Sequence, residues 1–222
     1  DVATCDVPGA FLHSELPSGK RMFLCLRGQM VDIMCEVNPE YAKHVRLQRG
    51  KKILYVRVIR SIYGCIEAAL LWYELYKDTL EKEGFVLNPY ETCIANKMID
   101  GHQCTIAWYV DDNKVSHRNP IVVTNVLNMI EGKFGKLTIT RGREHDYLGM
   151  KIKLKNDSFE ISMNDQIKDA IETFGEELSG IVTSPCARHL FETRDDAEKL
   201  DEARRETFHT VTAKLLYIEK RA

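Results

Sequence analysis

Two adjacent carboxylates, Asp111 and Asp112, have the residue types and spacing that point most directly to chemistry. They follow Tyr109-Val110 and lie between two apolar runs, residues 105–108 and 113–115. Asp is depleted in strands but tolerated in turns, so the pattern predicts a β-hairpin whose tight turn carries both acids. Such a turn could hold a hard cation through oxygen ligands; the alternative is an ordinary solvated hairpin tip.

A third carboxylate, Asp6, is the candidate partner of this pair. Residues 2–7 predict a short strand that delivers Asp6 before Pro8-Gly9 breaks it. One antiparallel sheet could bring Asp6 to Asp111, 105 residues further along the chain. Three acids around one point repel each other unless cations neutralise them. Two Mg²⁺ ions held there could stabilise the attacking and leaving oxygens of a phosphoryl transfer.

The composition indicates a globular protein. The chain has 222 residues, of which 44% are hydrophobic and 29% charged, enough for one large domain or a domain with a small appendage. Its net charge is −2, whereas nucleic-acid binders often carry a basic excess, so such binding would depend on local patches. The densest basic run contains Arg46, Arg49, Lys51 and Lys52 and predicts either a solvated loop or contacts with phosphates.

The cysteines and the hydropathy indicate the cellular compartment of the protein. Seven cysteines at irregular spacings, without a C-x-x-C pair, argue against a disulfide framework and a zinc site. We therefore expect a reduced, intracellular and cytoplasmic protein. No run of 18 apolar residues occurs, so no membrane span is expected. The chain starts at Asp1 without a signal peptide, inside a structured-looking stretch, which suggests a fragment of a longer protein.

Periodicity indicates the elements that must position the acids. Strands are expected over residues 2–7, 21–26, 53–59, 93–99, 102–110, 113–117, 137–140, 147–154 and 159–162. Asp100-Gly101 predicts a two-residue hairpin turn. Residues 28–51 are mixed, with a short helix near 40–44.

Longer helices are expected at four places: over about 66–83 with a stop at Gly84, from Asn119-Pro120 onward, after a capping-box-like segment at 162–165, and around 208–218. Trp72 and Tyr76 lie on the apolar face of the first of these helices and are interpreted as core. The order of elements predicts an α+β fold, an antiparallel sheet packed on helices over residues 1–162, followed by a small helical region over 163–222.

Five segments resemble the copia-type retrotransposon reverse transcriptases and occur in the same order. They are Asp6–His13, Arg60–Gly64 with Trp72-Tyr73, Tyr109–Asp112, Tyr147–Ile152 and Ala213–Tyr217. The resemblance covers nearly the whole chain. It implies a right-hand polymerase palm over 1–162, without the N-terminal part of the fingers, and a truncated thumb-like region over 163–222.

The resemblance also implies the activity, an RNA-directed DNA polymerase that uses two Mg²⁺ ions, with Mn²⁺ as a substitute. It implies RNA and DNA template-primers and dNTPs as substrates. It implies integrase and RNase H as partners within a Gag-Pol-type polyprotein, virus-like particles in the cytoplasm, and no membrane.

The resemblance further implies roles for single residues. Asp6 and Asp111 would be the principal metal ligands, and Asp112 the third catalytic acid. Phe11 would lie under the sugar of the incoming nucleotide and select dNTP over NTP, although a plain core aromatic is the alternative. The remaining contacts would come from Gly64 and Val110 at the nucleotide and primer terminus, and from Tyr109, Tyr147, Leu148 and Gly149 at the primer or template.

The sequence departs from the family after Gly64. Residues 65–70 read Cys-Ile-Glu-Ala-Ala-Leu where the family usually has L-K-Q-A-P-R, so no nucleotide contact beyond Gly64 is carried over to this turn. In the family, the basic fingers residues that hold the triphosphate precede the first motif, so the isolated chain is expected to be inactive alone. Two alternatives stay open: an inactive or repurposed element fragment that keeps the fold and binds nucleic acid, and another palm-type enzyme such as a nucleotide cyclase.

Overall fold

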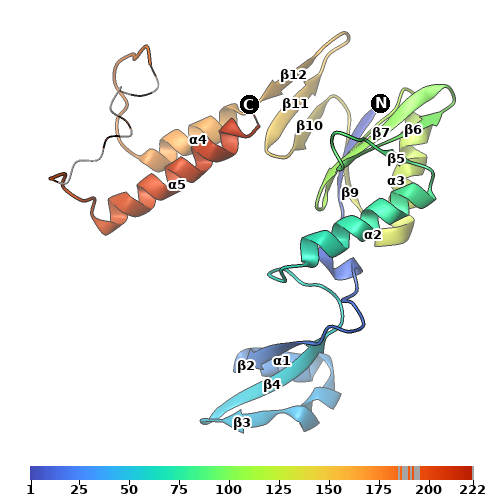
Figure 1. Cartoon of the computed structure of the whole chain (residues 1–222), viewed down its shortest axis with the longest axis vertical. Coiled ribbons are helices and arrows are strands. Elements are labelled where there is room, and N and C mark those ends of the chain that lie inside the picture. Colours follow the sequence, from blue (N-terminus) through green and yellow to red (C-terminus); the bar gives the residue numbers. More distant parts are fainter. Residues whose placement is uncertain (185, 187–189, 191, 193–195, 222) are drawn as a thin grey trace. The chain divides into compact units, whose positions relative to one another are not determined.

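The computed structural model describes residues 1–184, 186, 190, 192 and 196–221. It divides the chain into two compact units, Asp1–His145 and Asp146–Ala222 (Figure 1). The boundary expected at residue 162 falls inside the second unit. The strands between 147 and 162 therefore belong with the C-terminal helices rather than with the large sheet.

A six-stranded antiparallel sheet forms the centre of the first unit. Its order is β5 (Val86–Leu87), β6 (Ile94–Ile99), β7 (His102–Tyr109), β8 (Asp112–Ser116), β1 (Val2–Asp6) and β9 (Thr138–Arg141). The predicted turn between β6 and β7 is confirmed, because Ile99 pairs with His102 and both Asp100 and Gly101 have positive φ. That is the backbone a two-residue hairpin requires.

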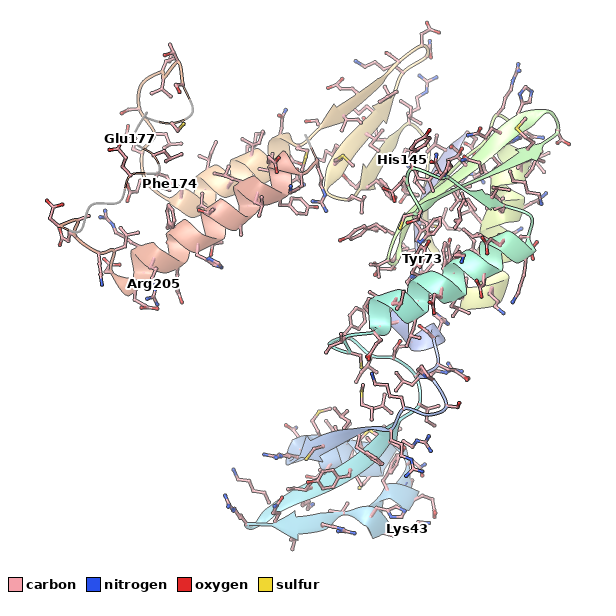
Figure 2. The ribbon with its side chains drawn as sticks, in the orientation of Figure 1. Lys43, Tyr73, His145, Phe174, Glu177 and Arg205 are labelled. Carbon is pink, nitrogen blue, oxygen red and sulfur yellow. The ribbon has the colours of Figure 1, made fainter. Side chains whose placement is uncertain are left out.

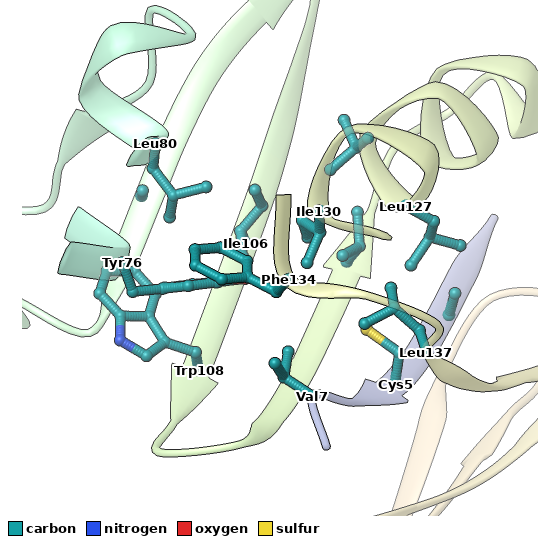
Figure 3. Close-up of a cluster of buried hydrophobic side chains, with 14 of the residues drawn as sticks. Cys5, Val7, Tyr76, Leu80, Ile106, Trp108, Leu127, Ile130, Phe134 and Leu137 are labelled. Carbon is teal, nitrogen blue, oxygen red and sulfur yellow. The ribbon is translucent and has the colours of Figure 1, made fainter. Parts of the chain in front are cut away.

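One face of this sheet is covered by α2 (Ala68–Lys82) and α3 (Pro120–Phe134). Alternate strand residues point into the core between them, as Figure 3 shows for Ile106 and Trp108 beside Tyr76 and Phe134. Trp72 and Tyr76 are 1% and 0% exposed, so the core interpretation is confirmed. The capped start of α3 is also confirmed, because the Asn119 side chain accepts from the Ile121 amide.

A second, smaller sheet has the order β2 (Met22–Arg27), β4 (Lys51–Val58) and β3 (Arg46–Gln48). Between β2 and β3 lie α1 (Gln29–Val37) and the 3₁₀ helix η2 (Pro39–His44), and η1 (Ala10–His13) follows β1. The helix α1 was not expected in the mixed segment 28–51. It begins after Gly28 without a side-chain cap, and it packs Val31 against Leu26 and Leu54.

The second unit contains a three-stranded sheet, β10 (Glu144–Tyr147), β11 (Met150–Leu154) and β12 (Phe159–Ser162), followed by α4 (Asn164–Phe174) and α5 (Glu202–Glu219). The strand expected over 147–154 is wrong at its start, because Leu148 and Gly149 turn the chain with φ of 51° and 73°. The expected capping box is also wrong, since Met163 is the N-cap of α4 and makes no side-chain cap bond. Within the described residues, no helix is long and apolar enough to cross a membrane.

Candidate active site

The acids come together at one end of the large sheet. Asp112, the first residue of β8, lies directly opposite Asp6 of β1 on one side and Tyr109 of β7 on the other. Residues directly opposite across antiparallel strands have Cβ atoms about 4.5–5.5 Å apart. Their strand neighbours Cys5, Trp108 and Asn113 are buried, so Asp6, Tyr109 and Asp112 share the face turned away from α2 and α3.

The turn between β7 and β8 consists of Val110 and Asp111, because Tyr109 pairs with Asp112. The prediction that both acids lie in the turn is therefore half right. Asp111 is in the turn, whereas Asp112 begins the returning strand. This offset leaves Asp111 beside the Asp6–Asp112 pair without a strand partner of its own.

Three hydrogen bonds fix this turn to the core. The Trp72 indole N–H of α2 donates to the Val110 carbonyl at 2.7 Å. The Asp111 carbonyl accepts from the Val7 amide at 3.0 Å and from the Asn113 side-chain amide at 2.7 Å. The turn that carries the acid is thereby tied to β1, to β8 and to α2.

These bonds hold a conformation that the local sequence disfavours. Val110 has φ of 57°, and a β-branched residue in the left-handed region is a genuine outlier. The conformation costs roughly 1–2 kcal/mol. The indole bond and the partial burial of Val110 against the core offset that cost.

A buried polar pair extends the same support. Asn113 is fully buried, and its side-chain oxygen accepts from the Tyr76 hydroxyl at 2.5 Å while its nitrogen donates to Asp111. Trp72, Tyr76 and Asn113 thus position the turn, a role that the sequence analysis did not assign to them. Buried indole N–H and phenol O–H groups need hydrogen-bond partners. The prediction that Trp72 and Tyr76 are buried could therefore have indicated that each bonds to a polar group nearby.

The three carboxylates lie close enough to perturb each other. Burial, and then the charge of Asp111, raises the pKa of Asp6 above its usual value. Burial, followed by Asp111 and Asp6, likewise raises the pKa of Asp112. The acids therefore repel one another when ionised, and a cation between them would relieve that repulsion.

Carboxylate oxygens are the donors that a hard divalent ion takes. Mg²⁺ takes one or two carboxylates and completes its shell with waters and substrate phosphates. Asp6 and Asp112, opposite each other, with Asp111 next to them, offer such oxygens. Among the described residues, no group of three or more His, Cys, Asp or Glu side chains is placed so that it could by itself hold a metal ion. An ion here would therefore depend on substrate and solvent for its remaining ligands.

Phe11 and Gly64 belong to segments that the structure brings together. The Phe11 carbonyl accepts from the Ser61 hydroxyl at 2.6 Å, and the Phe11 ring lies 4.9 Å from that of Tyr63. Phe11 is half-buried and packs against the main core, so both of its interpretations fit its position. Gly64 has φ of 91°, and nothing lies within 4 Å of the place of a Cβ.

Tyr147, Leu148 and Gly149 belong to the second unit, where they join β10 to β11. The Leu148 carbonyl accepts from the Tyr217 hydroxyl of α5 at 2.9 Å. This bond joins two of the segments that resemble the family, Tyr147–Ile152 and Ala213–Tyr217. The four-residue match at Tyr109–Asp112 lies in the first unit.

Replacing Gly149 by Ala is expected to loosen the second unit by about 1–3 kcal/mol, because the residue needs a positive φ and its Cβ would overlap the Tyr217 hydroxyl. Hydrogen exchange of α5 should accelerate in Gly149→Ala. Gly180→Ala is the matched control, since Gly180 also has a positive φ but no atom within 4 Å of its Cβ position. Equal exchange of α5 in both variants would contradict the prediction.

The thiol of Cys5 should be inert in the folded protein. It is 5% exposed, and burial, followed by Asp6 and Asp112, raises its pKa to about 12. The thiolate is the reactive form, so iodoacetamide at pH 8 should label exposed Cys186 long before Cys5. Peptide mapping by mass spectrometry measures both rates, with a urea-unfolded sample as control. Native rates that match for the two thiols would contradict this packing.

The first unit is thus of the α+β class, an antiparallel sheet backed by two helices with three acids at one end of its strands. A family model described as "Reverse transcriptase (RNA-dependent DNA polymerase)" matches residues 26–187. The chain therefore belongs to the reverse transcriptase family. The match includes Gly64, Tyr109–Asp112 and Tyr147–Gly149 but not Asp6 or Phe11, so the assignment of Asp6 rests on its strand register with Asp112.

Proposed function

We propose that this chain is the palm and part of the thumb of a copia-type retrotransposon reverse transcriptase and that it catalyses template-directed DNA synthesis. The observation that carries the proposal is the pairing of Asp6 with Asp112 beside the Asp111 turn, in a chain of the reverse transcriptase family. Its substrates are dNTPs and an RNA or DNA template-primer. Integrase and RNase H are its partners within the polyprotein.

In this proposal the primer 3′-hydroxyl attacks the α-phosphorus of the dNTP in line, and pyrophosphate leaves. Asp6, Asp111 and Asp112 would hold two Mg²⁺ ions, for which Mn²⁺ could substitute. When bound, the ions supply Lewis-acid stabilisation of the attacking and leaving oxygens. The chain contributes positioning: the pinned turn keeps Asp111 beside Asp6 throughout the cycle.

The other residues act on the substrates. The half-buried Phe11 ring faces the sugar and excludes a 2′-hydroxyl, and Gly64 lets the backbone approach the template–nucleotide pair because no side chain fills that space. Val110 packs beside the primer terminus. Tyr109, which is 56% exposed, and the turn of Tyr147, Leu148 and Gly149 contact the primer or template.

Primer extension tests the proposal. The chain would be assayed with a primed RNA template, the four dNTPs and Mg²⁺, both alone and with a reverse-transcriptase fingers segment fused upstream. We expect extension by the form that carries the fingers segment, and this extension should stop when the complementary dNTP or the metal is omitted. Binding of nucleic acid without incorporation in either form would favour a repurposed element fragment. NTP turnover without a template would instead indicate a nucleotide cyclase.

A further inference from the structure

The small sheet β2-β4-β3 has one face covered by α1 and one face without a helix. On the covered face Leu26 and Leu54 pair across the strands and pack on Val31. Strand residues alternate between faces, so the register assigns the other set to the exposed face. This set, the basic-aromatic face, contains Phe23, Cys25, Arg27, Arg46, Gln48, Lys51, Ile53, Tyr55 and Arg57; of these, Ile53 is buried, 4% exposed, between its strand partners Arg27 and Arg46.

The basic-aromatic face carries positive charge without acidic neighbours. None of the three strands contains Asp or Glu. Four side chains of this face, those of Arg27, Arg46, Lys51 and Arg57, are exposed and pair with no carboxylate in the described part of the chain. Of the three acids between β2 and β3, Asp32 pairs with Lys52 at 2.5 Å and Glu40 pairs with Lys43, while Glu36 forms no ion pair with these four cations. The cations of this face are therefore available to an anion.

Two large rings lie among these cations. Phe23 and Tyr55 are 58% and 56% exposed, although both are on a sheet that has a core of its own. The register places Phe23 opposite Arg57, and Tyr55 opposite Cys25. Rings and guanidinium groups thus alternate across the face. Exposed aromatics interleaved with cations favour binding of unstacked bases together with their phosphates.

A hollow adjoins this face. It has a volume of about 330 Å³ and is lined by Lys43, His44, Val45, Arg46 and Tyr55. Figure 2 shows Lys43 on this lobe. Arg46 supplies a guanidinium group to this hollow and Tyr55 offers its ring as one wall, while Lys43 is paired with Glu40. These groups could receive one phosphate and the base next to it.

We propose that the basic-aromatic face binds an unpaired RNA strand, with Arg27, Arg46, Lys51 and Arg57 on its phosphates and Phe23 and Tyr55 stacking on its bases. A duplex hides the faces of its bases, so rings presented this way favour a single strand. The identity of the strand as the template rests on the proposed function. The binding itself does not, because it needs neither the acids nor a metal.

Fluorescence anisotropy with a labelled 12-nucleotide RNA, in EDTA and over a range of salt concentrations, tests this proposal on the full chain. Tyr55→Ala should weaken binding roughly tenfold, and Tyr55→Phe should bind nearly as the wild type, since stacking needs only the ring. Arg46→Ala with Arg57→Ala should lower the salt dependence by roughly one to one and a half ion equivalents. The same RNA annealed into a duplex should bind more weakly than the single strand.

Matched controls lie elsewhere on the first unit. Tyr90→Ala removes a ring that is 97% exposed, and Arg118→Ala removes an exposed cation near His102. Both should bind RNA as the wild type, and circular dichroism should show all variants folded. Affinity that Tyr55→Ala leaves unchanged, or equal affinity for the duplex, would overturn the proposal. Primer extension by the wild type in that case would leave the proposed function standing, whereas RNA binding without extension would remove only the proposed function.

Discussion

Asp111→Asn is expected to lower Mg²⁺-dependent nucleotide incorporation by at least about 10³-fold while it stabilises the metal-free protein. The loss of incorporation follows from the proposed function, in which Asp111 is a charged oxygen ligand of the metal where the transition state gains negative charge. The metal-free protein becomes more stable because the variant removes the charge of Asp111, which repels Asp6 and Asp112 and raises the pKa of both. Single-nucleotide extension and thermal melting without metal measure the two effects.

The pH dependence has a defined sign. Asp6 and Asp112 have folded pKa values above the ordinary 3.8, so their contribution to stability is greatest when they are protonated and declines as the pH rises through the folded values. The melting temperature of the metal-free wild type should therefore fall at this site as the pH rises from the ordinary carboxyl pKa of 3.8 through the higher folded pKa values of Asp6 and Asp112. Mg²⁺ should restore about 2–4 °C at neutral pH. Both effects should shrink in Asp111→Asn.

Asp78→Asn is the matched control, because Asp78 is an exposed acid on α2 away from this end of the sheet. It should alter neither incorporation nor the response to Mg²⁺. If Asp111→Asn extended primers within twofold of the wild type, the assignment of the acids would be wrong. If it lost activity but melted at a lower temperature, the repulsion argument alone would be wrong.

Trp72→Ala is expected to cost about 3–5 kcal/mol of folding free energy, a large share of what a domain of this size has. The ring is 1% exposed and lies 5.0 Å from Phe134 and 5.2 Å from Tyr76. Its removal leaves a cavity, and the Val110 carbonyl also loses its donor. Denaturant unfolding followed by circular dichroism measures the loss.

Trp72→Phe separates packing from positioning. It keeps an aromatic ring against Phe134 but lacks the N–H that bonds to Val110, so about 1–2 kcal/mol of stability should be lost. Incorporation should fall about tenfold or more in a protein that stays folded, because the turn that holds Asp111 is less restrained. A folded Trp72→Phe protein with wild-type incorporation would show that the indole bond does not position the site.

The residue pattern predicted the antiparallel sheet, the helices that cover it and the proximity of Asp6 to the Asp pair. It could do so because the alternation of apolar residues in strands, and their spacing in helices, reflect which face of each element is buried. It did not predict α1, which is short, lacks a capping side chain and buries only a few residues on a small sheet. It also missed the break at Leu148-Gly149, where one non-glycine residue adopts a positive φ. Tertiary bonds stabilise such backbone, so single-residue propensities cannot indicate it.

The hydrogen bonds that hold the turn with Asp111 could likewise not be predicted from sequence patterns. Hydrogen bonds from Trp72 and Tyr76 reach residues 38 and 37 positions away, and nothing in the local sequence connects them. The basic run of the sequence contains Arg46 and Lys51 of the basic-aromatic face, but the sequence did not indicate that Arg27 and Arg57 would join them on one face of the small sheet. Strand register, rather than composition, separates those cations from the acids of α1.

The left-handed Val110 has a consequence for how such sites are found in genomes. The acids of a Tyr-Val-Asp-Asp string favour a turn, but Val disfavours the left-handed backbone that this turn requires, so the same four letters in an unrelated chain need not adopt this geometry. The string becomes informative when a tryptophan upstream can supply the N–H that holds the turn, as Trp72 does here. A search that requires both the string and that tryptophan should discard chance matches that the string alone retains.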